Sequence, residues 1–282
     1  MPQQPKSLAD WLVFFGQAEI PVLRHTVREL ERLCADETLL NARSVADVVT
    51  DDPLMTVKLL RYLQTHKHRN QKYELVDVKQ ALLMLGLDTF FREVPAMPVA
   101  EDMLSDHRAA LVHLLQTVRR ARRAAHYAYD WALRLHDLHA EEVLVSALLT
   151  CFPEMLMWCF NPVPMLEIDR RQAADPALRS VDAQKQVLGF AGAELLRQLT
   201  DEWRLPELLR NLTDPALAHT ARVRNVMLAV NLARHSAQGW DNAALPDDFR
   251  EIAALLRMEP DKVMALVKAT PAVTEDQAGP PG

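Results

Sequence analysis

The chain has 282 residues, of which 49% are hydrophobic and only 7 are glycine. Its formal net charge at pH 7 is -6, so no overall positive field favours binding to nucleic acid or to an anionic membrane surface. The scarcity of glycine argues against glycine-rich phosphate loops and tight hairpins. Because leucine, alanine, arginine and glutamate dominate and are good helix formers, we predict an all-α fold.

Targeting and redox signals are weak in this sequence. The apolar run near the N-terminus is too short for a signal peptide, and no stretch approaches about 18 uninterrupted apolar residues. Cys34, Cys151 and Cys159 are odd in number and lack the spacing of a disulfide framework. We expect a soluble, cytoplasmic protein without a membrane contact.

Capping residues predict the helices of the first hundred residues. A short amphipathic helix over 7–16 would begin at Ser7, and a second would cover 23–35. Ser44, followed three residues later by Asp47, has the capping-box pattern and predicts the start of a third helix.

Asp52 and Pro53 predict the next helix start, because aspartate caps well and proline is tolerated at the first helical position. Its inward face would consist of Leu54, Val57, Leu60 and Leu63. Gly86 is a predicted C-terminal cap, and Asp88 would start another helix. Two prolines in 94–106 indicate a boundary between two halves of the chain.

The second half is predicted to be helical as well. A long helix would cover 107–135, another would begin at Ala140, and the proline-rich segment 160–169 would be an irregular loop. Two helices over 182–203 and 205–212 would be separated at Pro206. The last predicted helices cover 216–237, 245–258 and 259–269.

Four segments occur in a recognisable order over residues 19–212. They are "EIPVLRHTVREL", "SVADVVTDDPLMTVKLLRYLQ", "VKQALLMLGLDTFF" and "GAELLRQLTDEWRLPELL". This ordered set resembles the HDOD domain family, helical relatives of the HD phosphohydrolases found in bacterial signalling proteins. Gln64 and Thr65 depart from the Asn-Ser that usually follows the second segment.

The resemblance implies a multi-helix HDOD/HD-like bundle. We expect an N-terminal helical half over 1–105, an HD-like half with C-terminal helices over 106–270, and a disordered tail over 271–282. The implied function is a non-catalytic regulatory module that binds protein partners in signal transduction, without a cofactor.

The apolar stretch "VSALLTCFPEMLMW" carries Thr150, Cys151 and Glu154 around a proline. In HD hydrolases, which this region resembles, a His-Asp pair lies at the first two of these positions. That pair, with further histidines and an aspartate, holds a divalent metal that activates water. Neither threonine nor a thiol is a good ligand for a hard metal ion.

The other metal-ligand positions implied by the resemblance are also replaced. Arg120 falls near the position of a histidine on the preceding long helix, Phe190 near a later one, and Asn231 near the final aspartate. We therefore predict a degenerate metal site in which a core helix has lost its catalytic residues. The alternative is a vestigial pocket around Thr150, Cys151, Phe190 and Asn231 that still takes a small ligand.

Arg119, Arg120, Arg122 and Arg123 fall on one arc of the long helix, opposite an apolar face. The helical wheel therefore directs the arginines to solvent, which conflicts with a place for Arg120 in a pocket. They could form a docking patch for an acidic partner or a phosphate-bearing ligand. An ordinary solvated helix face is the favoured interpretation.

His136, Asp137 and His139 contain the literal His-Asp pair of this chain. They could ligate a surface metal, and with His126 they are the candidates for a displaced hydrolase site. An exposed helix end, where histidine complements the helix dipole, is the favoured interpretation.

The basic segment that follows the fourth predicted helix contains only one aromatic residue. It consists of His66, Lys67, His68, Arg69 and Lys72 beside Tyr73. A surface for nucleic acid usually alternates charged with stacking residues, so we expect a solvated loop and no nucleic-acid partner. Trp203 is predicted to anchor the core.

We therefore predict a non-enzymatic signalling module that acts through protein contacts. The two alternatives are a metal-dependent phosphohydrolase of the HD superfamily and a regulator that binds a cyclic dinucleotide or a similar anion. The sequence makes no prediction about the oligomeric state.

Overall fold

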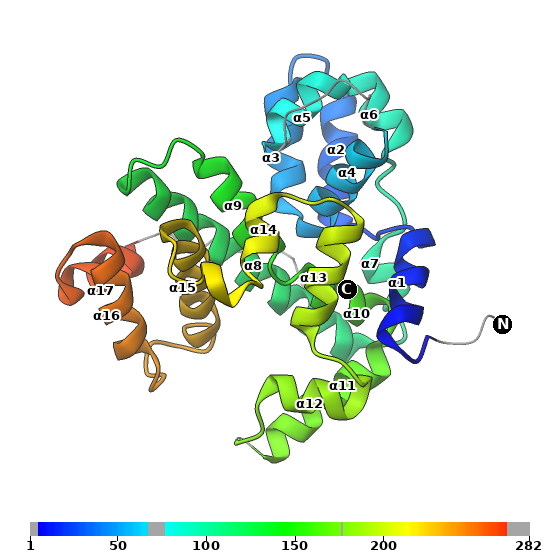
Figure 1. Ribbon diagram of the computed structural model, residues 1–282. Coiled ribbons are helices and arrows are strands. Elements are labelled where there is room, and N and C mark those ends of the chain that lie inside the picture. Colours follow the sequence, from blue (N-terminus) through cyan, green and yellow to red (C-terminus); the bar gives the residue numbers. More distant parts are fainter. Residues whose placement is uncertain (1–4, 67–76, 176, 270–282) are drawn as a thin grey trace, which may run out of the picture.

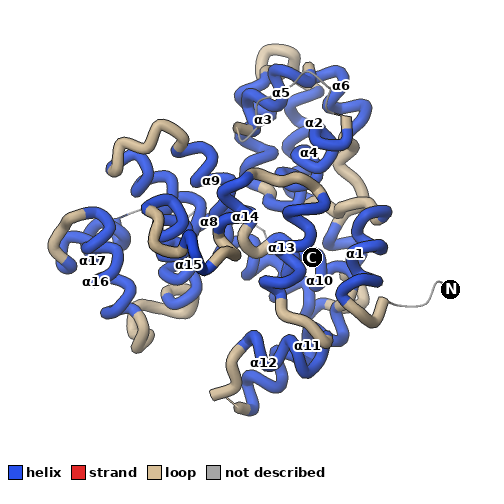
Figure 2. The backbone as a smooth tube through the Cα atoms, viewed as in Figure 1, coloured by secondary structure: helices blue, strands red, loops and turns tan. Residues whose placement is uncertain are grey.

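The computed structural model describes residues 5–66, 77–175 and 177–269 (Figure 1). Within these ranges every regular element is a helix, apart from one isolated bridge between Val22 and Val99 (Figure 2). The predicted all-α fold is confirmed. The predicted tail over 271–282 lies outside the described residues.

The described residues of the first half of the chain form seven short helices, which Figure 1 colours from blue to green-cyan. They are α1 (Leu8–Gln17), α2 (Arg24–Cys34), α3 (Ala42–Asp51), α4 (Pro53–Thr65), α5 (Val78–Leu85), α6 (Leu87–Glu93) and α7 (Ala100–Met103). Helices α2 to α6 form one lobe at the top of Figure 1, and α1 packs against α13.

The second half is built around one long helix. It comprises α8 (Arg108–Arg134), α9 (Ala140–Leu149), α10 (Phe152–Phe160), α11 (Pro162–Ala174), α12 (Ser180–Leu188), α13 (Gly192–Glu202), α14 (Glu207–Asn211), a short 3-10 turn (Pro215–Leu217), α15 (Ala221–His235), α16 (Leu245–Leu256) and α17 (Pro260–Ala269). Helices α9, α10 and α15 pack on α8, and α11 with α12 forms a hairpin at the lower edge of Figure 1.

Most predicted helix starts are confirmed, because capping is a local interaction. Ser7 caps α1 with Asp10 in a complete capping box, Asp52 caps α4, and Gly86 ends α5 with a φ of 79°. The prediction for Ser44 was wrong. Asn41 caps α3 by accepting from the N–H groups of Arg43 and Ser44, so Ser44 is the third residue of that helix.

Further boundaries differ from the prediction: α6 begins at Leu87, before Asp88, and α15 begins at Ala221 and not at 216. Two larger differences have a clear cause. Residues 160–169 are not a loop, since α11 begins at Pro162 and carries both prolines in its first turn, where the missing N–H groups have no intrahelical partner. The helix predicted over 182–203 is two helices, because Gly189 adopts the left-handed conformation (φ 83°) and ends α12.

The stretch predicted as one core helix around Thr150 is an elbow between two helices. Helix α9 ends at Leu149, and α10 begins at Phe152 with Pro153 in its first turn. Among the described residues, Ala140–Phe160 is the one stretch long and apolar enough to cross a membrane, but 72% of its most apolar window is buried within the fold. It therefore forms the core of this protein.

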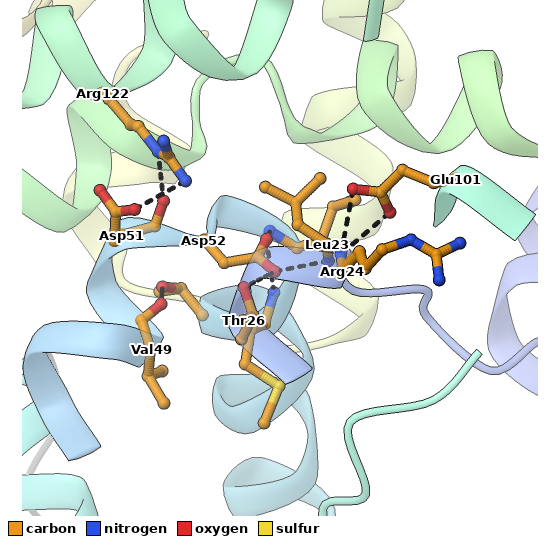
Figure 3. A network of polar contacts seen from close by, with 11 residues as sticks. Leu23, Arg24, Thr26, Val49, Asp51, Asp52, Glu101 and Arg122 are labelled. Carbon is orange, nitrogen blue, oxygen red and sulfur yellow. Dashed lines mark hydrogen bonds and ion pairs between the residues drawn. The ribbon is translucent and has the colours of Figure 1, made fainter. Parts of the chain in front are cut away.

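A buried carboxylate joins helices α2 and α4 (Figure 3). Asp52 has no exposed surface and accepts hydrogen bonds from the N–H of Leu23 (2.8 Å) and the hydroxyl of Thr26 (2.7 Å), at the start of α2. It also accepts from the N–H groups of Leu54 and Met55 in its own helix. One side chain thus satisfies donors from two helices and fixes their mutual position.

The neighbouring carboxylate connects this lobe to the long helix. Asp51 forms an ion pair with Arg122 of α8 at 2.7 Å, and the backbone carbonyl of Asp51 accepts from the Nε of the same arginine (Figure 3). The Arg122 side chain is 14% exposed, so this contact is sheltered from water. It links the long helix α8 to the C-terminal end of α3 through two contacts from one guanidinium.

Replacement of Asp52 by alanine should cost at least about 3 kcal/mol of unfolding free energy, because four donors would lose their buried acceptor. The matched control is Asp77→Ala, which removes an equivalent two-bond cap from the more exposed start of α5 and should cost about 1 kcal/mol. Urea unfolding followed by circular dichroism measures both. Equal losses in the two variants would contradict the role given to Asp52.

Candidate functional site

A cavity of about 310 Å³ lies beside the elbow, between α8, α10, α11, α12 and α15. Its lining is mainly polar on one side and aliphatic on the other, with Ala121, Ala124, Met165 and Ile168 among the apolar residues. The volume is at the lower end of the range for small-molecule sites, about 300–1,000 Å³.

Glu154 is the centre of the polar wall. Its Oε1 accepts from the Thr117 hydroxyl (3.0 Å), from Arg120 Nη2 (3.1 Å) and from Trp158 Nε1 (3.3 Å). Arg120 also donates to the Thr117 hydroxyl at 2.9 Å. His113, Thr117 and Arg120 are spaced i, i+4 and i+7 on α8, so they share the face that meets α10.

A second cluster lies farther along the same cavity. The His113 ring stacks on Trp158 with centroids 4.8 Å apart and an interplanar angle of 7°. His113 Nε2 lies 3.5 Å from Asp169 Oδ2 of α11. Gln172 donates to Ser180 at 2.9 Å, and Gln184 accepts from the N–H of Gly192 at 2.8 Å, so amide groups from α11 and α12 close the far side.

Cys151 lines the cavity at the elbow. Burial raises the pKa of its thiol to about 12, Glu154 adds to the rise, and the cations of Arg120 and Arg234 oppose it. The group is therefore a protonated thiol near neutral pH, which is a poor metal ligand and a weak nucleophile.

The other residues assigned to a vestigial pocket are dispersed. Thr150 donates its hydroxyl to the carbonyl of Ser146 (2.9 Å) within its own helix end. Phe190 is 3% exposed and belongs to the core. Asn231 accepts from Arg234 Nη2 at 3.2 Å. Of the four residues, Cys151 alone is part of the cavity lining. Thr150 directly precedes Cys151 in the chain, and Asn231 lies three residues before the lining residue Arg234.

The four arginines of α8 do not point to solvent as one patch, which corrects the helical-wheel expectation. Arg119 is exposed, Arg120 lines the cavity, Arg122 pairs with Asp51, and the Arg123 guanidinium lies 5.8 Å from the centre of the Trp240 ring. At 100° per residue the four cover an arc of about 160°. Because α8 is packed by neighbours on several sides, the two edges of that arc meet different helices.

The literal His-Asp pair lies away from the cavity, at the end of α8. Asp137 pairs with Arg222 at 2.7 Å and accepts from the N–H of His139. Burial acts to raise the pKa of Asp137, but the hydrogen bonds from Arg222 and from the N–H of His139, together with the charge of Arg222, outweigh it, and the pKa lies below its usual value. The Arg222 guanidinium thus occupies the position next to the Asp137 carboxylate that a metal ion would need. His126 is exposed on α8.

The remaining predictions concern Trp203 and the basic segment that follows α4. Trp203 is 5% exposed and stacks on Phe152 with centroids 5.7 Å apart, so its predicted place in the core is confirmed. Of the basic segment, His66 is described and exposed. Lys67, His68, Arg69, Lys72 and Tyr73 lie outside the described residues.

The cavity does not fit the metal that HD hydrolases hold. At the elbow the available groups are an arginine, a threonine hydroxyl and a protonated thiol, and the carboxylate of Glu154 is already bonded to Arg120. No group of three or more histidine, cysteine, aspartate or glutamate residues arranged for a metal ion occurs in the described part of the chain. A guanidinium beside the carboxylate opposes a dication by charge repulsion.

Sequence reasoning missed several lining residues. His113, Asp169 and Arg234 received no role, and Glu154 was noted without a partner. The i, i+4, i+7 spacing from His113 to Arg120 was a signal that these side chains share a face. The pairing of Arg120 with Glu154 joins residues 34 apart in the chain, and no local pattern indicates it.

The fold and the cavity define an all-helical domain with a polar pocket that holds the Arg120–Glu154 ion pair. The model of the HDOD domain matches residues 20–220, so the chain belongs to the HDOD domain family. The resemblance stated from the sequence is confirmed. No curated protein matches the chain significantly.

Solved structures support the same fold. An MmoQ response regulator from Methylococcus capsulatus str. Bath is similar with a TM-score of 0.68 at 16% identity, covering 89% of this chain and 98% of that one. A virulence factor from Campylobacter jejuni subsp. jejuni is similar with a TM-score of 0.66 at 18% identity, covering 92% of both chains. At these identities the likeness concerns the fold.

The three cysteines should differ strongly in reactivity. Alkylation with iodoacetamide at pH 8 should modify exposed Cys34 at least about a hundredfold faster than Cys151, whose raised pKa leaves little thiolate. Cys159 should also react slowly, because burial raises the pKa of its thiol. Peptide mass spectrometry over time measures the rates, with urea-unfolded protein as the control. A Cys151 as fast as Cys34 would refute the described environment.

Proposed function

We propose that this chain is a non-enzymatic HDOD-type module that acts in bacterial signalling through contacts with other proteins in the cytoplasm. Its HD-like pocket no longer supports metal-dependent phosphoester hydrolysis. No nucleic acid is a partner in this proposal, in keeping with the net charge of -6.

The observation that carries the proposal is the pairing of Arg120 with Glu154 beside Cys151. Hydrolysis of this type needs a dication that lowers the pKa of a bound water and polarises the phosphoryl group. An arginine supplies positive charge, but it offers no coordination position and does not generate hydroxide near neutral pH. The scaffold therefore keeps its helices and loses the group that would carry the reaction.

A displaced hydrolase site at His136, Asp137 and His139 is the first alternative. The two-point pairing of Asp137 with Arg222, at 2.7 Å for each bond, uses both carboxylate oxygens. Arg222 also contacts Glu142 at 3.1 Å, so the nearby acidic groups share this cation. These contacts favour a structural role, in which Arg222 ties α15 to the end of α8 and the start of α9.

Recognition of a cyclic dinucleotide by the arginines of α8 is the second alternative. Such a ligand has two phosphates and needs several converging cations. Arg122 and Arg123 are already engaged with Asp51 and Trp240, on sides of α8 that differ from that of Arg120. The arrangement thus offers no common arginine surface for a ligand of that size.

Catalytic inactivity has a direct test. Purified protein should contain well under one divalent metal ion per chain by elemental analysis. It should also hydrolyse neither phosphomonoesters nor cyclic dinucleotides above the blank when Mn²⁺ or Mg²⁺ is added. An HD phosphohydrolase assayed in parallel is the positive control. Stoichiometric metal together with turnover would overturn the proposal.

Binding to protein partners is tested by affinity capture from extract of the native cell. The chain should retain one or a few signalling proteins in amounts comparable to its own, and the retention should survive nuclease treatment. A helical protein of similar size and charge is the control. Loss of all retained protein after nuclease treatment would indicate a nucleic-acid contact and contradict this part of the proposal.

A further inference from the structure

The cavity beside the elbow has a built-in charge asymmetry. At the end nearest Cys151, the cations of Arg120 and Arg234 both act on the thiol, with the carboxylate of Glu154 between helices α8 and α10. Trp158, which donates to Glu154, is followed by the His113 ring stacked on it and then by Asp169 of α11, so Asp169 marks the other end of this row of contacts. Two cations and one carboxylate thus lie at one end, and one carboxylate lies at the other.

Arg234 is the cation with unused capacity. Its Nη2 donates to the amide oxygen of Asn231 and lies 3.3 Å from Nε2 of His235. The carboxylate behind them, Asp248, is bonded to His235 at 2.6 Å. Within the described chain no carboxylate lies within ion-pair distance of Arg234. A guanidinium has five N–H donors, so most of its donors remain for a ligand.

The Arg120 cation is only loosely held. The side chains of Arg120 and Glu154 are 33% and 34% exposed, and ion pairs of that exposure contribute little to stability. An incoming anion can therefore exchange with Glu154 at little cost. The ligand carboxylate or phosphate would then lie between two arginines at the elbow.

The opposite end accepts hydrogen bonds. Asp169 is 52% exposed and faces His113 with Oδ2, while Oδ1 has no hydrogen-bond partner among the described residues. Beside it, His113 is stacked on the buried Trp158, so the outer face of the His113 ring is the planar surface offered to a ligand, and the amides of Gln172 and Gln184 complete the wall. The cavity of about 310 Å³ limits the size of what it can hold.

We propose that this cavity binds a small planar molecule with one anionic group at one end, recognised by Arg234 and Arg120, and an amino donor at the other, recognised by Asp169. This inference goes beyond the proposed protein-contact function. Such a ligand would bridge α15 and α8 to the hairpin of α11 and α12, which packs on the rest of the molecule mainly through α11. Ligand binding would therefore fix the position of this hairpin.

Calorimetric titration with two probes tests the site. 4-Aminobenzoate carries the anion as a carboxylate, and adenosine 5′-monophosphate carries it as a phosphate. Both present an amino group on a planar ring, so their relative affinities distinguish the two kinds of anion. Benzoate lacks the donor and aniline lacks the anion. We expect at least one of the two probes to bind, and benzoate and aniline to bind more weakly than 4-aminobenzoate.

Matched variants separate the two ends of the cavity. Arg234→Gln should weaken 4-aminobenzoate and benzoate alike by about tenfold or more, because it removes a charge-assisted hydrogen bond. Asp169→Asn should weaken 4-aminobenzoate and leave benzoate unchanged. Arg119→Gln and Asp182→Asn, exposed neighbours outside the cavity lining, are the controls and should have no effect. Thermal unfolding confirms that each variant is folded.

Two further readouts complete the test. Glu154→Gln should strengthen anion binding, since it releases Arg120. A bound probe should slow hydrogen exchange of the backbone amides in α12.

Absence of binding by both probes at millimolar concentration would overturn the proposal, as would equal probe affinities of Arg234→Gln and the wild type. Neither result bears on the protein-contact function, because the capture experiment uses no added ligand.

Discussion

Two adjacent carboxylates, Asp51 at the end of α3 and Asp52 at the start of α4, connect the N-terminal lobe to the long helix. Asp52 is held by donors from α2 and α4, and Asp51 holds Arg122 of α8. Since a helix is stiff, fixing the direction of Arg122 also fixes the opposite side of α8, about 200° away, where Arg120 lies. The cavity beside the elbow thus depends on an interaction in the other half of the chain.

The parts of the fold that the sequence predicted are those with local causes. Ser7, Asp52 and Gly86 end or start helices through contacts within four residues. The errors have a common origin in ambiguous local signals. The prolines of 160–169 favour a loop in isolation, yet they fit the first turn of α11, and only packing against α8 and α10 decides between the two.

The candidate site was less predictable than the fold. Cys151 and Arg120 were singled out as replacements of metal ligands, and both line the cavity. Their partners come from α10, α11 and α15, at separations that no periodicity reveals. The helical wheel gave the correct directions of the α8 arginines around the helix axis. It could not show that neighbouring helices cover both edges of the arc that these arginines occupy. Burial is a property of the assembled bundle.

Charge compensation explains why a pocket persists without metal ligands. An unpaired carboxylate beside the elbow would lose hydration without gaining an ion pair or hydrogen bond, and this would cost free energy. Arg120 supplies the opposite charge, and Thr117 and Trp158 supply neutral donors, so Glu154 is satisfied while the cavity stays polar. An apolar replacement would favour collapse of the cavity onto α8. The side chains that compensate Glu154 are therefore the same ones that keep the space open to a ligand.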